Sequence, residues 1–203
     1  MYDLEFLTDA NGRRVAAFGF HAGFAGAAAG ALAYAAQKTG TKLGALEPYP
    51  NEQAMVADVK AKLRGRENNV KALIIGALGR CGRGAVDLFT KIGLKEYAYV
   101  VQRVTWPDLG AFRDNIVKWD LDETAKGGPF QEILDVDIFV NCIYLTTPIP
   151  SFLNLEQIDS VGNRRRLSVV VDVSCDTTNP NNPIPIYSIN TTFLEPTVPA
   201  DIE

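Results

Sequence analysis

The sequence predicts one α/β domain over residues 1–203, with a doubly wound, Rossmann-type and mainly parallel sheet and helices on both faces. Strand-like runs alternate with helix-like runs, which is typical of a parallel sheet. The run at 70–76 (VKALIIG) is apolar almost throughout, as in a central strand buried on both faces. With 203 residues, 47% of them hydrophobic and 22% charged, the chain has the composition of a globular protein.

The first elements follow from periodicity and turn residues. We expect a strand over 13–20, a glycine-bearing turn at 19–23 and then an Ala-rich helix that ends near Lys38. After a loop rich in glycine and proline, Asn51 is a plausible N-cap for a helix that runs to Arg64. The apolar strand at 70–76 leads into a helix over 82–92.

The segment 95–115 interrupts this alternation, and we interpret it as an insertion before a short strand at 115–120. Two further strands are expected at 136–145 and 167–174, and an edge strand at 184–189.

Charge and cysteine usage exclude several classes of function. The net charge is −4 and the only dense basic cluster, 164–166, reads as a solvated loop entering a strand, so no nucleic-acid partner is indicated. The uncharged stretch from Val15 to Gln37 is long enough to span a membrane, but alanine and glycine contribute little to insertion. The three cysteines are isolated, which indicates neither a disulfide framework nor a metal site and fits a reducing cytoplasm.

A glycine-rich loop gives the strongest local signal. Gly76, Gly79 and Gly82 follow the buried strand directly and open the next helix, with Arg80 and Cys81 between them. Glycines there allow the backbone to turn tightly and approach a pyrophosphate, which meets free N–H groups at the positive end of the helix. The spacing is GxxGxxG rather than GxGxxG, and a tight turn without a ligand is the alternative.

Other polar residues stand at the expected strand ends. Asp120 is placed to accept hydrogen bonds from an adenine-ribose diol and so to select NAD over NADP, although it lies farther from the loop than usual. The polar run 172–180 follows a buried strand at the edge where α/β sheets bind ligands. The paired Arg13 and Arg14 suit carboxylate or phosphate recognition, although a solvated strand entry is the simpler interpretation.

Six longer motifs resemble the NAD-dependent, lysine-forming saccharopine dehydrogenase family. They are GRRVAAFGFHAGFAGAA, EPYPNE, ALIIGALGRCGRGAVDL, KWDLDETAKGGPF, DIFVNCIYL and VVDVSCDTTNPNNPIPIY. They cover nearly the whole chain apart from 95–115 and the last residues. A more distant similarity extends to alanine dehydrogenase and the transhydrogenase nucleotide domain.

The resemblance implies a role for each matching position. The positions expected to contact NAD are Arg13, Gly79, Arg80, Asp120, Thr124, Tyr144 and Val173. Those expected to contact the amino-acid substrate are Arg14, Phe18, Ser174, Cys175 and Asp176.

The resemblance also implies what acts together with this chain. The family oxidises saccharopine with NAD and water to lysine, 2-oxoglutarate and NADH, in lysine biosynthesis by the aminoadipate route. Its acid–base Lys and His lie in a preceding N-terminal domain, so we expect no catalytic residue in this chain and a partner domain of the same enzyme. The alternatives are a standalone nucleotide-binding module, an amino-acid dehydrogenase of the alanine dehydrogenase type, and a transferase that uses S-adenosylmethionine.

The strand order of a doubly wound fold adds one geometric expectation. Cys81 follows the first Rossmann strand, and Cys142 lies near the end of the strand expected beside it at the switch point. We therefore predict that the two sulfurs lie close together by the cofactor, that oxidation can join them, and that the bond hinders NAD binding. Two small residues chosen for packing are the alternative.

Overall fold

A parallel sheet organises the chain. The computed structural model describes residues 4–12, 14–94, 96–100, 128–145, 147–174 and 177–200. In this part of the chain four parallel strands lie in the order β2-β1-β3-β4. They are β1 (Lys71–Ile75), β2 (Glu96–Val100), β3 (Ile138–Asn141) and β4 (Val169–Asp172). The chain winds outward from β1 to β2 on one side and from β3 to β4 on the other, which confirms the predicted doubly wound topology.

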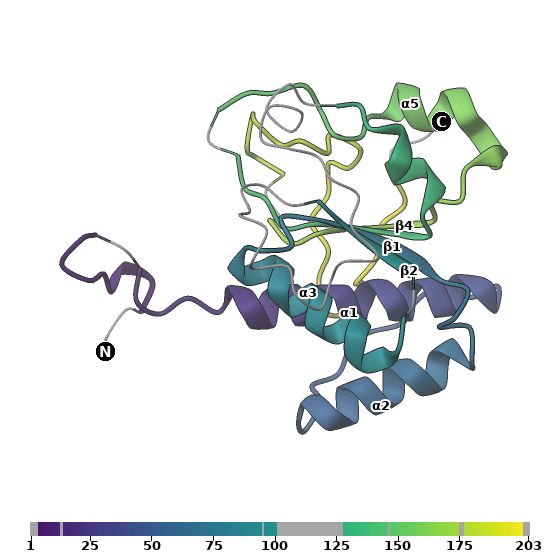
Figure 1. The fold of residues 1–203 in the computed structure, drawn as a ribbon, viewed down its shortest axis with the longest axis horizontal. Coiled ribbons are helices and arrows are strands. Elements are labelled where there is room, and N and C mark those ends of the chain that lie inside the picture. Colours follow the sequence, from purple (N-terminus) through teal and green to yellow (C-terminus); the bar gives the residue numbers. More distant parts are fainter. Residues whose placement is uncertain are drawn as a thin grey trace.

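Helices cover both faces of this sheet. The α-helices are α1 (Gly19–Lys38), α2 (Glu52–Leu63), α3 (Arg80–Ile92) and α5 (Leu155–Val161), and the 3₁₀ helices are η1 (Leu4–Phe6), η3 (Gln131–Asp135) and η4 (Gly162–Arg164). Helices α1 and α3 lie on one face with α2 beyond them, and α5 lies on the other (Figure 1). A separate apolar core fills each face, centred on side chains such as Ile74 and Phe89 on one and Phe139 and Phe152 on the other.

Helix α2 has the cap that the sequence predicts. The Asn51 side chain accepts a hydrogen bond from the Ala54 N–H at 2.9 Å, which satisfies one of the free donors of the first turn. The helix ends where Arg64 takes a left-handed conformation with φ of 54°. Helix α3 ends in the same way at Gly93, with φ of 85°.

The start of α1 differs from the prediction. No strand forms over the described residues of 13–20: Arg14 pairs with Thr8 in an isolated β-bridge, and the helix begins at Gly19. The segment 19–23 is therefore the first turn of α1 rather than a separate loop. A Cβ at Gly23 would stand 1.8 Å from the Cys81 carbonyl oxygen, so its glycine allows α1 to pack directly on α3.

The predictions for 95–115 and for 184–189 also need correction. The segment 95–115 is not wholly an insertion, because its residues Glu96–Val100 form β2 and pair with β1. The strand expected at 115–120 lies outside the described residues. Residues 184–189 form no strand, since Pro183 directly precedes the run, Pro185 lies within it, and neither has the N–H that a ladder requires.

At the amino ends of the strands, Arg166 is exposed, as predicted for the basic cluster 164–166, and it also pairs with a buried carboxylate. Its guanidinium donates to the Asp137 carboxylate at 2.7 Å, and residue Asp137 is 3% exposed. Asp137 also accepts a hydrogen bond from the Lys71 N–H at 2.9 Å. This edge of the sheet is therefore closed by a structural ion pair.

The Ala-rich α1 packs within the fold, and Ala27 and Ala31 are fully buried. None of the helices in the described ranges combines the length and apolarity needed to cross a bilayer.

Candidate functional site

The turn between β1 and α3 is tight enough to require its glycines. Gly76 has φ of 85°, and a Cβ on it would lie 2.9 Å from a side-chain carbon of Ile143. A Cβ on Gly82 would lie 2.1 Å from the Gly76 carbonyl oxygen, so no other residue fits without movement of the backbone. The Gly79 N–H donates to that same carbonyl at 2.9 Å. The predicted glycine loop is thus a compact connection from strand to helix.

This turn leaves the start of α3 without a side-chain cap. The N-cap position is Gly79, whereas Asn51 and Asn154 cap α2 and α5 through their side chains. The first hydrogen bond across the start of α3 runs from the Arg83 N–H to the Gly79 carbonyl at 3.0 Å. The preceding amides therefore point out of the helix end, where the helix dipole and the exposed Arg80 side chain favour an anion.

The end of β3 lies directly beside this turn. The Cys142 N–H donates to the Ile75 carbonyl at 3.0 Å, which places Cys142 next to the last residue of β1. Burial, reinforced by the neighbouring Cys81 and Asp172, raises the pKa of the Cys142 thiol to about 12. Burial also raises the pKa of Cys81, against the opposing effect of Arg80. Both thiols are free, so their predicted disulfide stays a prediction.

The end of β4 completes the same edge of the sheet. The Val173 N–H donates to the Asn141 carbonyl at 2.9 Å, and the Ser174 hydroxyl donates to the Asp172 carboxylate at 2.6 Å. Tyr144, two residues beyond Cys142, has 59% of its surface exposed. The structure thus brings together at one edge most of the described candidates, namely Gly76, Gly79, Arg80, Cys81, Gly82, Cys142, Tyr144, Val173 and Ser174.

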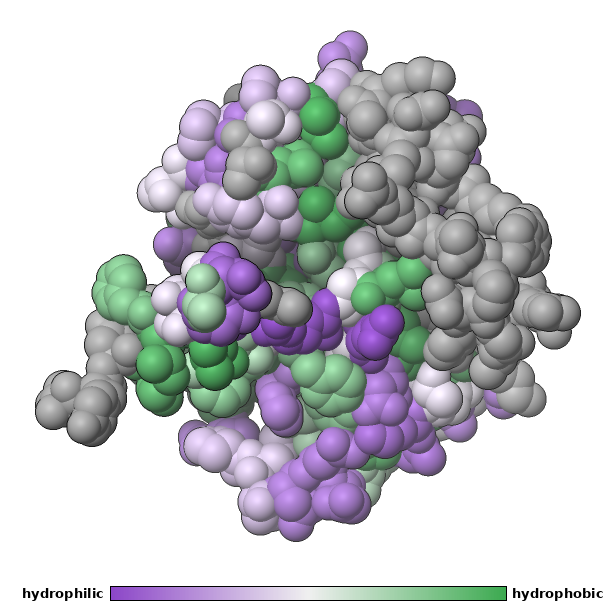
Figure 2. Space-filling view, turned by 60° about the vertical axis from the view of Figure 1, so that its left-hand side comes forward, coloured by the Kyte–Doolittle hydropathy of each residue, from purple (hydrophilic) through white to green (hydrophobic). Residues whose placement is uncertain are grey.

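The N-terminal candidates divide between this edge and a projecting segment. Phe18 immediately precedes α1 and is 64% exposed, and a Cβ on the adjacent Gly19 would lie 3.0 Å from the Cys81 sulfur. Arg14 pairs with Thr8 in the segment that precedes α1, and this segment extends away from the sheet (Figure 1). Figure 2 shows apolar side chains gathered on this segment, where Phe6 and Leu7 are exposed.

Several predicted site residues lie outside the described part of the chain, so nothing is added about their placement. They are Arg13, Asp120, Thr124, Cys175 and Asp176.

Sequence reasoning missed a polar cluster just behind the strand ends. Asn141 is fully buried and is the register partner of Asp172, and Tyr187 reaches the same carboxylate from the C-terminal segment. A signal was present for Asn141, because an amide inside the apolar run DIFVNCIYL needs buried partners. No local pattern pointed to Tyr187, which follows β4 by 15 residues along the chain.

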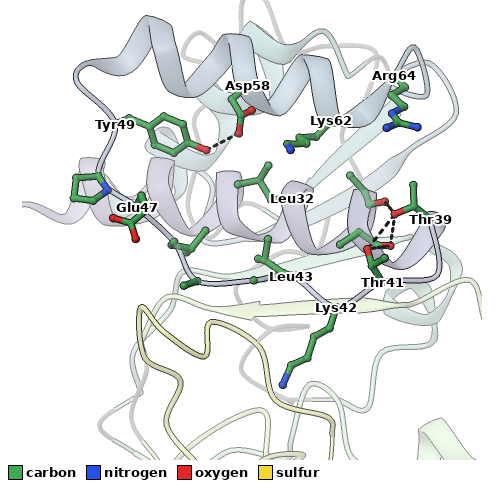
Figure 3. Close-up of a pocket in the computed structure, with 16 residues that line it drawn as sticks. Leu32, Thr39, Thr41, Lys42, Leu43, Glu47, Tyr49, Asp58, Lys62 and Arg64 are labelled. Atoms are coloured by element: carbon green, nitrogen blue, oxygen red, sulfur yellow. Dashed lines mark hydrogen bonds between the residues drawn. The ribbon is translucent and has the colours of Figure 1, made fainter.

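Two hollows flank α1. One of about 550 Å³ lies between the end of α1, the loop 41–49 and α2, and there the Tyr49 hydroxyl donates to Asp58 at 2.7 Å (Figure 3). Burial and this hydrogen bond raise the pKa of Tyr49 to about 12. The other, about 530 Å³, runs along β4 and α1 under the segment 186–200 and reaches Asp172 and Val173. Of these two hollows, only the second reaches the carboxyl ends of the strands, where the candidate site lies.

Curated relatives match the chain over nearly its whole length, although no protein-family model matches it. The chain is 52% identical to "Saccharopine dehydrogenase [NAD(+), L-lysine-forming]" of Yarrowia lipolytica, over 99% of this chain and 51% of that protein. It is 53% identical to the protein of the same name from Schizosaccharomyces pombe, over 98% of this chain and 50% of that protein. The Candida albicans protein of this name is 51% identical, over 100% of this chain and 53% of that protein.

The chain therefore spans about half the length of the curated relatives that it matches. The similarity includes the glycine loop and the strand ends that form the candidate site. The resemblance to the lysine-forming saccharopine dehydrogenases is confirmed at about 50% identity over about 99% of the chain.

Proposed function

We propose that this chain binds NAD across the carboxyl ends of β1, β3 and β4, as the cofactor-binding part of an oxidoreductase. The observation that carries the proposal is the uncapped start of α3, held by a glycine turn at the point where the strand order reverses. A pyrophosphate at the amides of Arg80–Gly82 would satisfy these donors. The glycine cradle fits such a group, because a Cβ at Gly82 would close the turn.

The remaining cofactor contacts follow from the family positions. Arg80, Tyr144 and Val173 border the edge where the cofactor would lie, with Cys81 and Cys142 beneath it. Asp120 would hold the adenine ribose and select NAD over NADP, and Arg13 and Thr124 would add further contacts to NAD. Arg14, Phe18, Ser174, Cys175 and Asp176 would hold the amino-acid substrate.

For the whole protein we propose the activity in the names of its relatives. Saccharopine would pass a hydride from its carbon beside the secondary amine to NAD, and water would then release lysine and 2-oxoglutarate. An acid–base pair would come from a further domain of the same enzyme, which the chain's coverage of half of each relative supports. We expect a cytoplasmic enzyme of lysine biosynthesis that has small-molecule substrates and neither a nucleic-acid nor a membrane partner.

Calorimetric titration of the purified chain tests the cofactor assignment. We expect saturable binding of NADH, clearly weaker binding of NADPH, and none of S-adenosylmethionine. Asp120→Ala should lower the affinity for NADH and narrow its margin over NADPH, since the ribose acceptor and the repulsive charge are both removed. Equal affinity of the wild-type chain for NADH and NADPH would refute the role of Asp120. Binding of S-adenosylmethionine alone would refute the oxidoreductase assignment.

A further inference from the structure

A buried polar cluster links the ends of β3 and β4. The Asn141 amide donates to the Asp172 carboxylate at 3.0 Å, between residues that are register partners in the sheet. The Tyr187 hydroxyl donates to the other oxygen of that carboxylate at 2.6 Å. Asn141 is fully buried and points to the face opposite α1, as Phe139 two residues earlier does. Side chains from two strands and the C-terminal segment thus converge on one carboxylate.

The same cluster fixes the backbone of both loops that leave these strands. Asp172 accepts hydrogen bonds from the Ser174 N–H at 3.1 Å and from the Ser174 hydroxyl at 2.6 Å. Asn141 accepts from the Ile143 N–H at 3.2 Å and donates to the Ile143 carbonyl at 3.1 Å. The turn that begins with Val173 and the loop that leads to Tyr144 are therefore held by one set of charge-assisted and amide hydrogen bonds.

In a doubly wound sheet, the two halves of a dinucleotide lie on opposite sides of the switch point. An adenosine on the β2 side leaves the nicotinamide on the side of β3 and β4. We propose that Asn141, Asp172 and Tyr187 are positioning residues, which set the two loops for the nicotinamide half of NAD and the adjacent substrate. This inference rests on the proposed function, and it adds residues that touch neither the pyrophosphate nor the adenosine.

Tyr187→Phe tests the inference with little change in packing, because it removes one hydroxyl from the cluster. The probes are NADH and ADP-ribose, which shares the pyrophosphate and adenosine but lacks the nicotinamide. We expect the Kd for NADH to rise about 5- to 10-fold and that for ADP-ribose to stay within about 2-fold. Asp172→Asn should weaken NADH binding more strongly and again spare ADP-ribose. The new NH2 group would face a group that now donates a hydrogen bond to the carboxylate.

Tyr49→Phe is the matched control. It removes the same kind of hydrogen bond, from a tyrosine hydroxyl to an aspartate at 2.7 Å, in the hollow between α1 and α2 (Figure 3). We expect it to leave the Kd of both ligands unchanged. Equal weakening of NADH and ADP-ribose by Tyr187→Phe would indicate a purely structural role and overturn the inference. An unchanged Kd for NADH, or the same loss from Tyr49→Phe, would overturn it too.

Amide hydrogen exchange gives a readout that needs no ligand. In Tyr187→Phe the amides of Ser174 and Ile143 should exchange about tenfold faster, because the carboxylate and amide that hold them are released. Unchanged exchange at both amides would contradict the inference. Failure of the wild-type chain to bind either ligand would instead contradict the proposed function, so the two failures are distinguishable.

Discussion

Gly79 and Gly82 lie in the same loop, but the lack of a side chain serves a different purpose at each. A Cβ at Gly82 would enter the space of the Gly76 carbonyl oxygen at 2.1 Å, so that glycine is needed for folding. Gly79 is exposed, has φ of −68°, and would bring a Cβ no closer than 3.1 Å to the same oxygen. A side chain at Gly79 therefore needs a backbone shift of only a few tenths of an ångström, and it would obstruct the space in front of the helix end.

Gly79→Val should consequently weaken NADH binding by more than about tenfold while leaving a folded chain, because the side chain blocks approach to the amides of α3. Calorimetry gives the affinity, and circular dichroism checks the fold. Gly44→Val is the control, since Gly44 is exposed and a Cβ on it would meet nothing within 4 Å. Unchanged NADH affinity in a folded Gly79→Val variant would contradict the assignment of this loop to pyrophosphate binding.

The Cys142 thiol gives a second test at the scale of single residues. Its pKa of about 12, against an ordinary 9.0, leaves about a thousandfold less thiolate at pH 8. Because the shift is upward, alkylation of Cys142 should be very slow at neutral pH and should accelerate about tenfold per pH unit up to that pKa. Mass spectrometry of iodoacetamide-treated chain would show this; alkylation of Cys142 as fast as a free thiol at pH 8 would contradict it.

The predicted disulfide between Cys81 and Cys142 follows from the same pair of residues. Oxidation should join them only slowly at neutral pH, because the raised pKa of each thiol lowers the thiolate that must attack. The bond should lower NADH affinity, and reductant should restore it. Cys142→Ser is the control, in which oxidant should leave NADH affinity unchanged. If the oxidised native chain binds NADH with the same affinity before and after reduction, the predicted effect of the disulfide on NADH binding is wrong.

The sequence predicted the chemistry of single residues best where that chemistry is local. The glycine turn could be predicted because strand, turn and helix are contiguous. The role of Asn141 could not, since its partner Asp172 is 31 residues away along the chain, and Tyr187, which donates to the same carboxylate, follows 15 residues later. The pairing of β3 with β4 brings Asn141 to Asp172, and the C-terminal segment brings Tyr187 to the same carboxylate.

At the scale of elements, the crossing of α1 over α3 depends on glycines from both helices. A Cβ at Gly84 would lie 1.9 Å from the Phe20 carbonyl oxygen, and one at Gly23 would lie 1.8 Å from that of Cys81. The sequence alone favoured a turn at Gly19–Gly23, because glycine is common in turns and a helix–helix contact is not visible in one segment. Similarly, β2 was mistaken for insertion since its pairing with β1 is a tertiary contact.

Gly23→Ala should lower the free energy of unfolding by about 3 kcal/mol, because the methyl group would force the two helices apart. Gly26→Ala on the same helix is the control. Its Cβ would meet only side-chain atoms of Val173 and Val171, at 3.3 and 3.4 Å, so the change should stay within about 1 kcal/mol. Urea unfolding measures both. Equal stability of the Gly23→Ala and Gly26→Ala variants would contradict the close crossing.

For the molecule as a whole, we propose that the chain supplies the edge of the sheet that binds the cofactor, and the resemblance assigns the acid–base groups to another domain. The 203-residue chain should therefore bind NADH and yet form no NADH from saccharopine and NAD. An absorbance assay at 340 nm, the wavelength at which NADH absorbs and NAD does not, would measure this. A rate above that of the same assay without saccharopine would show that the chain contains its own proton acceptor.

The most direct test of the central claim, that NAD binds at the start of α3, is to map NADH binding by amide NMR on the isotope-labelled chain. The amides of Arg80, Cys81 and Gly82 should show the largest shift changes, with smaller changes at Tyr144, Val173 and Ser174 across the same edge. The amides around Tyr49 and Asp58, beside α2, should not move. Saturable NADH binding that perturbs the α2 hollow and leaves Arg80–Gly82 unchanged would contradict the account.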